Sequence, residues 1–416
     1  MIKNKIIIKI LALAFIVIFN LNSKAEIFDM EKIFGNKIIK DTAARQAANP
    51  VADKKDLTVM VFKNAKNDLE EFSHLDMNEM EKVGSTDKMN IIVEYGRLKN
   101  PSAPNDWHGV RRYFVTKDTD EEVINSKVLW AKEKADMGSW KELADFVIWS
   151  KAHYPAEKYL LIVWNHGNGW KKSVKRNFVQ KGISFDDETG NHISTPELRK
   201  AFVKAGYVDV VAFDACLMQT AEVAYEIRDF TEVVTASEDT EPGDGYPYDR
   251  VFEGFENEKN LNSEKMGEII VKAFQKRNSE FYMDTTQSAI RVATLERLLK
   301  LLNEWTVIAL ASGEGNVIKR AFLSAQGFYE IDQKDIYDFL KVTEKYSSNE
   351  KFKNKSEEIM KYLIDEVVIA NGITGYRHVR AKGLAIYAPL KYVYNDEYED
   401  LLWARDGVWD EFLKNR

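Results

Sequence analysis

The chain of 416 residues carries 66 acidic and 59 basic side chains, a formal net charge of −7. An acidic surface argues against nucleic acids and anionic membranes as partners. Hydrophobic residues make up 45% of the chain, enough for one large domain or two ordinary ones, and a single cysteine, Cys216, excludes an internal disulfide.

The first 25 residues have the pattern of a secretory signal peptide. Three lysines precede the apolar run 10–19, and Ser23-Lys24-Ala25 places small residues at the −3 and −1 positions of a cleavage site. An apolar run of about ten residues is too short to span a bilayer, so we expect cleavage and no stable membrane insertion. The sequence therefore predicts a secreted or periplasmic protein, with residues 26–55 as a linker or pro-segment.

Short apolar runs alternate with amphipathic stretches between residues 56 and 250. We predict strands at 57–62, 90–95, 111–116, 159–164, 210–216 and 231–237, and helices at 69–83, 140–153, 195–206 and 217–230. Strands that alternate with helices indicate a mainly parallel sheet covered on both faces. Residues 249–380 are predicted to be mostly helical and 383–389 to form a late strand. The part 251–416 either completes this core or forms a second subdomain.

A histidine and the single cysteine stand at the ends of two predicted strands. His166 follows 159–164 in the motif Asn165-His166-Gly167-Asn168-Gly169-Trp170, and Cys216 ends the strand 210–216. Active sites in parallel sheets lie at the carboxyl ends of the strands, so the pair predicts a thiol nucleophile with an imidazole base. The N–H groups of Gly167 and Cys216 are candidates for an oxyanion hole, and we expect the helix after Cys216 to stabilise the thiolate. The alternative is that Cys216 is a small buried core residue.

Two aspartates are candidates for binding a cationic substrate side chain. Asp214 precedes Cys216 by two residues and so shares its side of the strand; the alternative is a cap for the following helix. Asp244 lies in the turn-rich loop Glu241-Pro242-Gly243-Asp244-Gly245, where the alternative is an ordinary solvated residue.

Basic residues follow the histidine motif closely. If the protein cuts after basic residues, this loop is its own substrate; otherwise it is a solvated basic loop. The candidate cleavage residues are Lys171, Lys172, Lys175, Arg176 and Lys181.

Metal binding has little support in the sequence. His74, His108, His153, His192 and His378 lack metal-ligand spacing, so we expect structural or surface roles for them. The acidic turn Asp186-Asp187-Glu188 lacks the register of an EF-hand loop and is predicted to be solvated.

Together these motifs resemble the clostripain family of cysteine peptidases, which is related to the caspases, gingipains and legumains. The strongest matches are the histidine motif and Asp214-Ala215-Cys216-Leu217-Met218. Supporting matches are 57–61, 67–70, 76–80 and 241–245, with weaker ones at 383–387 and 409–413, so the resemblance spans roughly residues 57–413.

The resemblance implies a caspase-like α/β/α sandwich with His166 as general base and Cys216 as nucleophile. It also implies an acidic S1 pocket formed by Asp214 and Asp244, a preference for Arg or Lys at P1, and self-cleavage between the two motifs. Lys63 and Lys66 stand where relatives usually carry acidic residues, which weakens any expectation of calcium dependence.

We therefore predict a secreted cysteine endopeptidase that requires no cofactor, acts on proteins or peptides containing Arg or Lys, and is monomeric, intact or nicked into two associated chains. Two alternatives stay open. One is an inactive exported binding module of the same fold. The other is a cysteine peptidase or acyltransferase of different P1 preference.

Overall fold

The computed structural model describes residues 52–99, 106–175 and 178–416, with the backbone alone between 172 and 181. The predicted signal peptide, and residues 26–51 of the predicted linker or pro-segment, lie outside the described residues. Within the described ranges, no helix is both long enough and apolar enough to cross a membrane.

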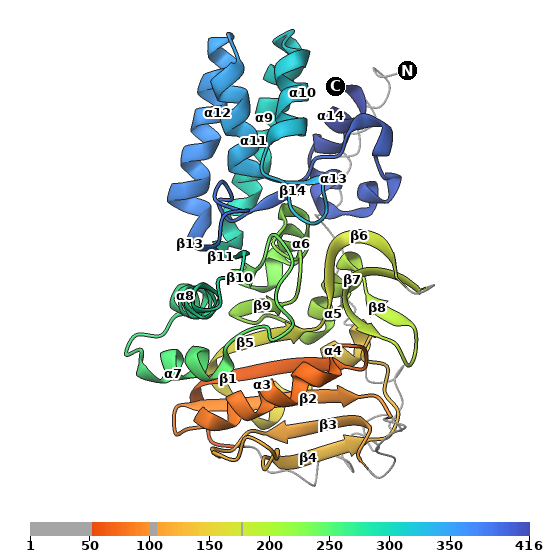
Figure 1. Ribbon diagram of the computed structural model, residues 1–416, viewed down its shortest axis with the longest axis vertical. Helices are drawn as coiled ribbons and strands as arrows, with labels where there is room; N and C mark the ends of the chain where they lie inside the picture. Colours follow the sequence, from red (N-terminus) through yellow and green to blue (C-terminus); the bar gives the residue numbers. More distant parts are fainter. Residues whose placement is uncertain (1–51, 100–105, 176–177) are drawn as a thin grey trace, which may run out of the picture. The chain divides into compact units, whose positions relative to one another are not determined.

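A nine-stranded sheet forms the centre of the fold, in the order β13-β11-β10-β9-β5-β1-β2-β3-β4 (Figure 1). The five neighbouring strands from β10 to β2 run parallel, and antiparallel strands extend the sheet on both sides. The strands are β1 Lys55–Ala65, β2 Met89–Arg97, β3 Gly109–Phe114, β4 Lys127–Lys132, β5 Ala156–Trp164, β9 Val210–Asp214, β10 Val233–Ala236, β11 Thr285–Arg291 and β13 Val368–Thr374. The mainly parallel sheet predicted from the sequence is confirmed.

Side-chain alternation along the central strands produces a core on each face of the sheet. In β1, Met60 and Phe62 belong to one core, whereas Val59 and Val61 belong to the other. The first core is covered by α4 Trp140–His153, α5 Thr195–Ala205 and α6 Ala221–Glu226, and the second by α3 Glu70–Val83, α7 Tyr248–Asn257 and α8 Ser263–Glu280. The result is the predicted α/β/α sandwich.

The C-terminal part supplies helices and also strands of the main sheet. Its elements are η3 Val292–Thr294, α9 Leu295–Ala311, α10 Gly315–Ser324, β12 Gln333–Asp335, α11 Ile336–Tyr346, α12 Glu350–Tyr362, η4 Leu363–Val367, β14 Ala385–Tyr387, η5 Lys391–Val393, η6 Asp396–Asp400, α13 Leu402–Asp406 and α14 Trp409–Asn415. The strands β11 and β13 were missed by the prediction that 249–380 is mostly helical. The reason is that β11 is polar, and its polar side chains bond to distant elements: Ser288, for example, donates to the Gly383 carbonyl at 2.7 Å.

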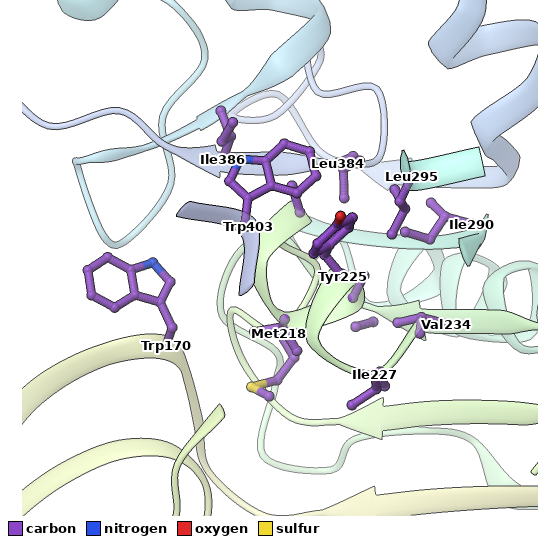
Figure 2. Close-up of a cluster of buried hydrophobic side chains, with 14 of the residues drawn as sticks. Trp170, Met218, Tyr225, Ile227, Val234, Ile290, Leu295, Leu384, Ile386 and Trp403 are labelled. Atoms are coloured by element: carbon purple, nitrogen blue, oxygen red, sulfur yellow. The ribbon is translucent and has the colours of Figure 1, made fainter. Parts of the chain in front are cut away.

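One buried cluster joins the C-terminal part to the first core (Figure 2). Tyr225 of α6 meets Trp403 of α13 edge to face, with ring centroids 5.2 Å apart. Leu295 at the start of α9 and Ile386 of β14 pack in the same cluster. The C-terminal part is thus packed against the helix that follows the cysteine motif.

The segment after the histidine motif is a β-hairpin, not the irregular basic loop expected from the sequence. Strands β6 Gly167–Lys175, β7 Phe178–Asp186 and β8 Asn191–Ile193 form a separate three-stranded antiparallel sheet. The charged residues obscured the strand pattern, because a two-stranded arm carries few apolar side chains of its own.

Candidate active site

The strands that precede the two predicted catalytic residues are neighbours in the parallel part of the sheet. β5 pairs with β9 in a register that places Trp164 opposite Asp214, and the Asn165 N–H donates to the Asp214 carbonyl at 3.3 Å. His166 and Cys216 therefore each follow this pair by two residues, at the carboxyl edge of the sheet. This is the edge at which active sites lie in open parallel sheets.

The backbone at Gly167 lies directly against the segment that carries Cys216. A Cβ atom at position 167 would lie 2.3 Å from the Cys216 carbonyl oxygen and 3.1 Å from the Cβ of Ala215. Only glycine permits such an approach. The two peptide groups predicted to donate to an oxyanion thus belong to contacting segments, and their catalytic role stays a prediction.

His166 is held from the turn that follows β1. Its Nε2 lies 2.6 Å from Oδ1 of Asp68, and its ring lies at 27° to that of Phe185 with centroids 6.4 Å apart. The side chains of His166 and Asp68 are 23% and 38% exposed, so this part of the site is open to solvent. Asp68 was not among the predicted site residues, because nothing in its local sequence indicates a contact with His166, which lies 98 residues later.

Cys216, like His166, is partly buried. Its Sγ accepts a hydrogen bond from the Glu241 N–H at 3.2 Å. Burial raises the pKa of the Cys216 thiol, the Glu241 N–H lowers it, and the carboxylate of Asp239 raises it again. The thiol is therefore favoured over the thiolate in the unliganded site.

The helix after Cys216 begins later than predicted. Leu217 has φ 64°, a left-handed conformation, and its N–H donates to the Asp239 carbonyl at 3.0 Å. α6 starts only at Ala221, with Thr220 Oγ1 as its cap, and a short helix η2, Arg228–Phe230, follows it. The expectation that a helix N-terminus directly after Cys216 stabilises the thiolate is therefore wrong.

Asp214, the first predicted carboxylate of an S1 pocket, is buried and fully hydrogen-bonded. It accepts from the Tyr248 hydroxyl at 2.7 Å and from the Tyr246 N–H at 3.1 Å. Burial raises the pKa of Asp214, while the bond from Tyr248 and the charge of Lys63 lower it. The alternative role as a helix cap is wrong, because Thr220 caps α6.

Asp244, the second predicted carboxylate, forms an ion pair within the protein. Its Oδ2 lies 2.7 Å from Nη2 of Arg277, whose Nη1 also contacts Glu79 at 2.9 Å. Asp244 is partly solvated, with its side chain 37% exposed, and its charge is matched within the protein by Arg277.

Glu241 was missed by the sequence interpretation, although it belongs to the same loop. Besides its N–H bond to Cys216, its buried carboxyl group adjoins that of Asp214, and burial and the charge of Asp214 raise the pKa of Glu241 well above the ordinary range. Three acidic side chains, those of Asp214, Glu241 and Asp244, thus come from the cysteine strand and the loop after β10.

The two lysines near the end of β1 bind carboxylates in the interior. Lys63 pairs with Asp76, both fully buried, and its Nζ lies 3.7 Å from the ring centroid of Trp164. Lys66 pairs with Glu188 and lies 3.6 Å from Asp186.

The acidic turn at 186–188 is solvated only in part: Asp187 and Glu188 are exposed, as predicted, whereas Asp186 is not. Asp186 is buried and accepts from the Met137 N–H at 3.0 Å as well as facing Lys66. Within 52–99, 106–175 and 178–416, no group of three or more His, Cys, Asp or Glu side chains is arranged to hold a metal ion.

Of the candidate cleavage residues, Lys171 is the one whose side chain the structure describes. Its Nζ bridges Glu330 at 2.8 Å and Asp332 at 2.7 Å, which ties β6 to the segment before β12. The side chains of Lys172, Lys175, Arg176 and Lys181 lie outside the described part.

The remaining histidines differ in their burial and in their partners. His74, His108 and His192 are partly exposed, whereas His153 is buried against the ring of Trp149. His378 is buried with its Nε2 2.9 Å from Asp239, so it links the C-terminal part to the loop after β10.

Comparison with known proteins decides the family. The family model described as the clostripain family, Peptidase_C11, matches residues 61–415. The chain belongs to the clostripain family of cysteine peptidases. It is 25% identical to clostripain of Hathewaya histolytica over 398 residues, covering 80% of this chain and 74% of that protein.

Solved structures of family members share the fold. An inactive zymogen C11 protease from Parabacteroides distasonis matches with a TM-score of 0.65 at 19% identity, covering 86% of this chain and 99% of that one. A secreted C11 cysteine protease from Bacteroides thetaiotaomicron, in complex with an irreversible peptide inhibitor, matches with a TM-score of 0.63 at 20% identity, covering 85% and 99%. The predicted caspase-like sandwich is confirmed.

Proposed function

We propose that this cysteine peptidase is an exported endopeptidase that cleaves peptide bonds after Arg or Lys. The observation that supports its chemistry is the register of β5 against β9, which places His166 and Cys216 at adjacent strand ends. Export is supported by the charged and apolar pattern of residues 1–25. Cell fractionation, with N-terminal sequencing of the exported protein, tests the proposed cleavage after Ala25.

The reaction proposed for the pair is acyl transfer through a thioester. His166 takes the proton of the Cys216 thiol, the sulfur bonds to the scissile carbonyl carbon, and the proton passes to the leaving amine as the C–N bond breaks. Water then attacks the thioester, which releases the carboxylate product and restores the thiol. We assign the Gly167 and Cys216 N–H groups to the oxyanion, where loss of one donor typically costs about 10²–10³-fold in rate. These steps require no metal or organic cofactor.

The preference for a basic P1 residue rests on the acidic loop beside Cys216. Burial raises the pKa of both Asp214 and Glu241, so their carboxyl groups share a proton more readily than they carry two negative charges. An arriving guanidinium or ammonium group would stabilise the charged forms. Asp244 contributes only if the substrate competes with Arg277 for its carboxylate.

The test is hydrolysis of fluorogenic peptides that end in Arg, Lys, Asp or Leu, with and without a chelator, beside Cys216→Ala. We expect turnover of the Arg and Lys peptides that is lost in Cys216→Ala and insensitive to the chelator. Equal turnover of the Leu peptide would overturn the P1 preference while leaving the peptidase intact. Full activity in Cys216→Ala would overturn the mechanism, and an inert wild type would favour a binding module.

We also propose that the chain cleaves itself in the hairpin arm 171–181. Support comes from its five basic residues and its position between the two catalytic motifs. Cleavage at Lys171 must release its two ion pairs.

The two fragments would stay together as one monomeric unit, because β5 lies in the first fragment and pairs with β9 in the second. Wild-type protein should give two bands in a denaturing gel and one peak in size-exclusion chromatography, while Cys216→Ala remains a single band. A nicked Cys216→Ala sample from a protease-free preparation would assign the cut to another enzyme.

A further inference from the structure

The position of Asp68 adds a third member to the thiol–imidazole pair. Asp68 lies in the turn between β1 and α3, 98 residues before His166 in the chain, and its Oδ1 is 2.6 Å from Nε2 of the imidazole. We propose that Asp68 is a positioning residue that orients His166 and fixes its tautomer for proton transfer with Cys216. The proposal rests on the peptidase activity of the chain and not on its P1 preference.

The chemistry follows from which nitrogen Asp68 contacts. A carboxylate can only accept a hydrogen bond from the ring, so Nε2 carries the proton and Nδ1 keeps the lone pair that can take the thiol proton. Once that proton has moved, the carboxylate of Asp68 also stabilises the imidazolium of His166. An acid that holds a catalytic imidazole in this way acts without contacting the substrate.

The turn that carries Asp68 is fixed by buried amide side chains that share one acceptor. Three of them, Asn64, Asn67 and Asn165, donate to the Phe185 carbonyl, at 3.2, 2.8 and 3.4 Å. The side chain of Asn67 also accepts a hydrogen bond from the Leu69 N–H at 2.9 Å. The two residues that flank Asp68 are therefore joined to each other.

Phe185, whose carbonyl accepts these bonds, also packs beside the imidazole of His166. The ring of Phe185 lies at 27° to that of His166, so one residue holds the Asp68 turn through its backbone and packs beside the imidazole through its side chain. Buried amides are costly unless every bond is made, so a network of this kind specifies one geometry. This network holds the Asp68 carboxylate within hydrogen-bonding distance of Nε2 of His166.

A simple surface ion pair is the competing explanation, and it makes a different prediction. Asp68 and His166 are 38% and 23% exposed, and exposed ion pairs add little to stability. If the pair were only structural, its removal would change neither stability nor rate by much. If Asp68 positions the base, its removal leaves the fold intact and lowers kcat.

The experiment compares Asp68→Ala and Asp68→Asn with Glu71→Ala, which removes an exposed carboxylate from the first turn of α3. Steady-state kinetics are measured on whichever of the four peptides the wild type turns over, and thermal melting is measured in parallel. We expect kcat to fall about 10²-fold in Asp68→Ala and at least as much in Asp68→Asn, because the Asn amide can donate to Nε2 and stabilise the wrong tautomer. KM and the melting temperature should stay near the wild-type values, and Glu71→Ala should resemble the wild type.

Three results would overturn the role of Asp68: a kcat in Asp68→Ala within about threefold of wild type, a loss carried by KM alone, or an equal loss in Glu71→Ala. A loss of kcat that follows a fall in melting temperature in both Asp68 variants would also overturn it in favour of a structural role. Failure of the peptidase assignment is distinguishable, because it would appear as an inert wild type.

Discussion

The imidazole half and the thiol half of the site differ in the burial of the carboxyl groups that lie beside the reactive side chain. The first consists of His166 and Asp68, whose side chains are 23% and 38% exposed. The second consists of Cys216 with Asp214 and Glu241, where burial raises the pKa of each of the three groups. The base is therefore hydrogen-bonded to an exposed carboxylate, whereas burial and the neighbouring carboxyl groups disfavour ionisation of the thiol.

The buried carboxyl groups beside Cys216 indicate how substrate binding could activate the site. A bound cationic side chain near Asp214 and Glu241 would favour charge in the thiol half, and the base next to it needs no rearrangement. We therefore expect substrate binding to promote ionisation of the Cys216 thiol and to leave His166 in place.

The largest effect is expected where the two halves touch. In Gly167→Ala the added Cβ would lie 2.3 Å from the Cys216 carbonyl, so the segments that carry imidazole and thiol must separate. Displacements of about 1 Å can cost about 10²-fold in rate, and we expect kcat/KM to fall by at least about that factor.

Gly315→Ala is the control for this variant, because a Cβ there meets no atom within 4 Å. Unchanged kinetics in Gly167→Ala would mean that the close approach is irrelevant to catalysis.

The next effect is on stability and concerns the ion pair behind the thiol half. Lys63→Met leaves Asp76 buried without its partner. Since the pKa of Asp76 is already raised to about 7 by burial, protonation relieves part of the penalty, and we expect a loss of about 2 kcal/mol in unfolding free energy. Chemical denaturation followed by tryptophan fluorescence measures it.

The unfolding free energy of Asp68→Ala, measured in the same way, compares the imidazole half with the thiol half. That variant should be nearly as stable as the wild type, because its ion pair is exposed. Lys265→Met, which removes a surface pair with Glu268, serves as the matched control for the lysine change. Equal destabilisation by Lys63→Met and Lys265→Met would contradict the account of a buried, strongly coupled pair.

A third test follows the protonation of the nucleophile. Only the thiolate reacts with iodoacetamide, and burial raises the pKa of the Cys216 thiol, so the rate should rise with pH and reach half its maximum above the pH seen for an exposed thiol. At pH 7 we expect alkylation of Cys216 to be about tenfold slower than that of N-acetylcysteine. A rate that is already maximal below pH 7 would instead reveal a preformed thiolate–imidazolium pair.

The placement of His166 and Cys216 at neighbouring strand ends could be predicted from the sequence, because each signal was local. An apolar run marked each strand, and glycines or a lone thiol marked its end. Parallel pairing then brings the two strand ends to the same edge of the sheet, as the register of Trp164 with Asp214 shows. The sandwich followed from the same alternation of strands and helices. Neither inference needed any knowledge of which distant residues meet.

The missed features all depend on such distant partners. Asp68 and Glu241 are polar residues in turns, and nothing within a few positions of either one shows that it contacts His166 or Cys216. The polar strand β11 is stable because Gln287 and Ser288 bond to other elements. The left-handed conformation of Leu217, which delays α6, has no signature in its side chain.

The smallest effect concerns burial remote from the thiol. Glu222 in α6 accepts from the Tyr387 N–H at 2.9 Å and the Tyr398 hydroxyl at 2.8 Å, and burial raises its pKa from 4.5 to about 7. The folded state therefore binds the proton more tightly than the unfolded state. The stability this confers is fully present below pH 4.5 and is lost as the pH rises through about 7.

We expect the melting temperature of the wild type to fall between pH 5 and pH 8. In Glu222→Gln this fall should be smaller by about 2 °C, because the amide keeps an acceptor oxygen without a charge. Glu253→Gln, on an exposed position of α7, should keep the wild-type slope. If Glu222→Gln also kept it, the carboxyl group would be ionised inside the protein. Burial alone would then be insufficient to hold acids neutral in this chain, and the same reasoning for Asp214 and Glu241 beside Cys216 would lose its basis.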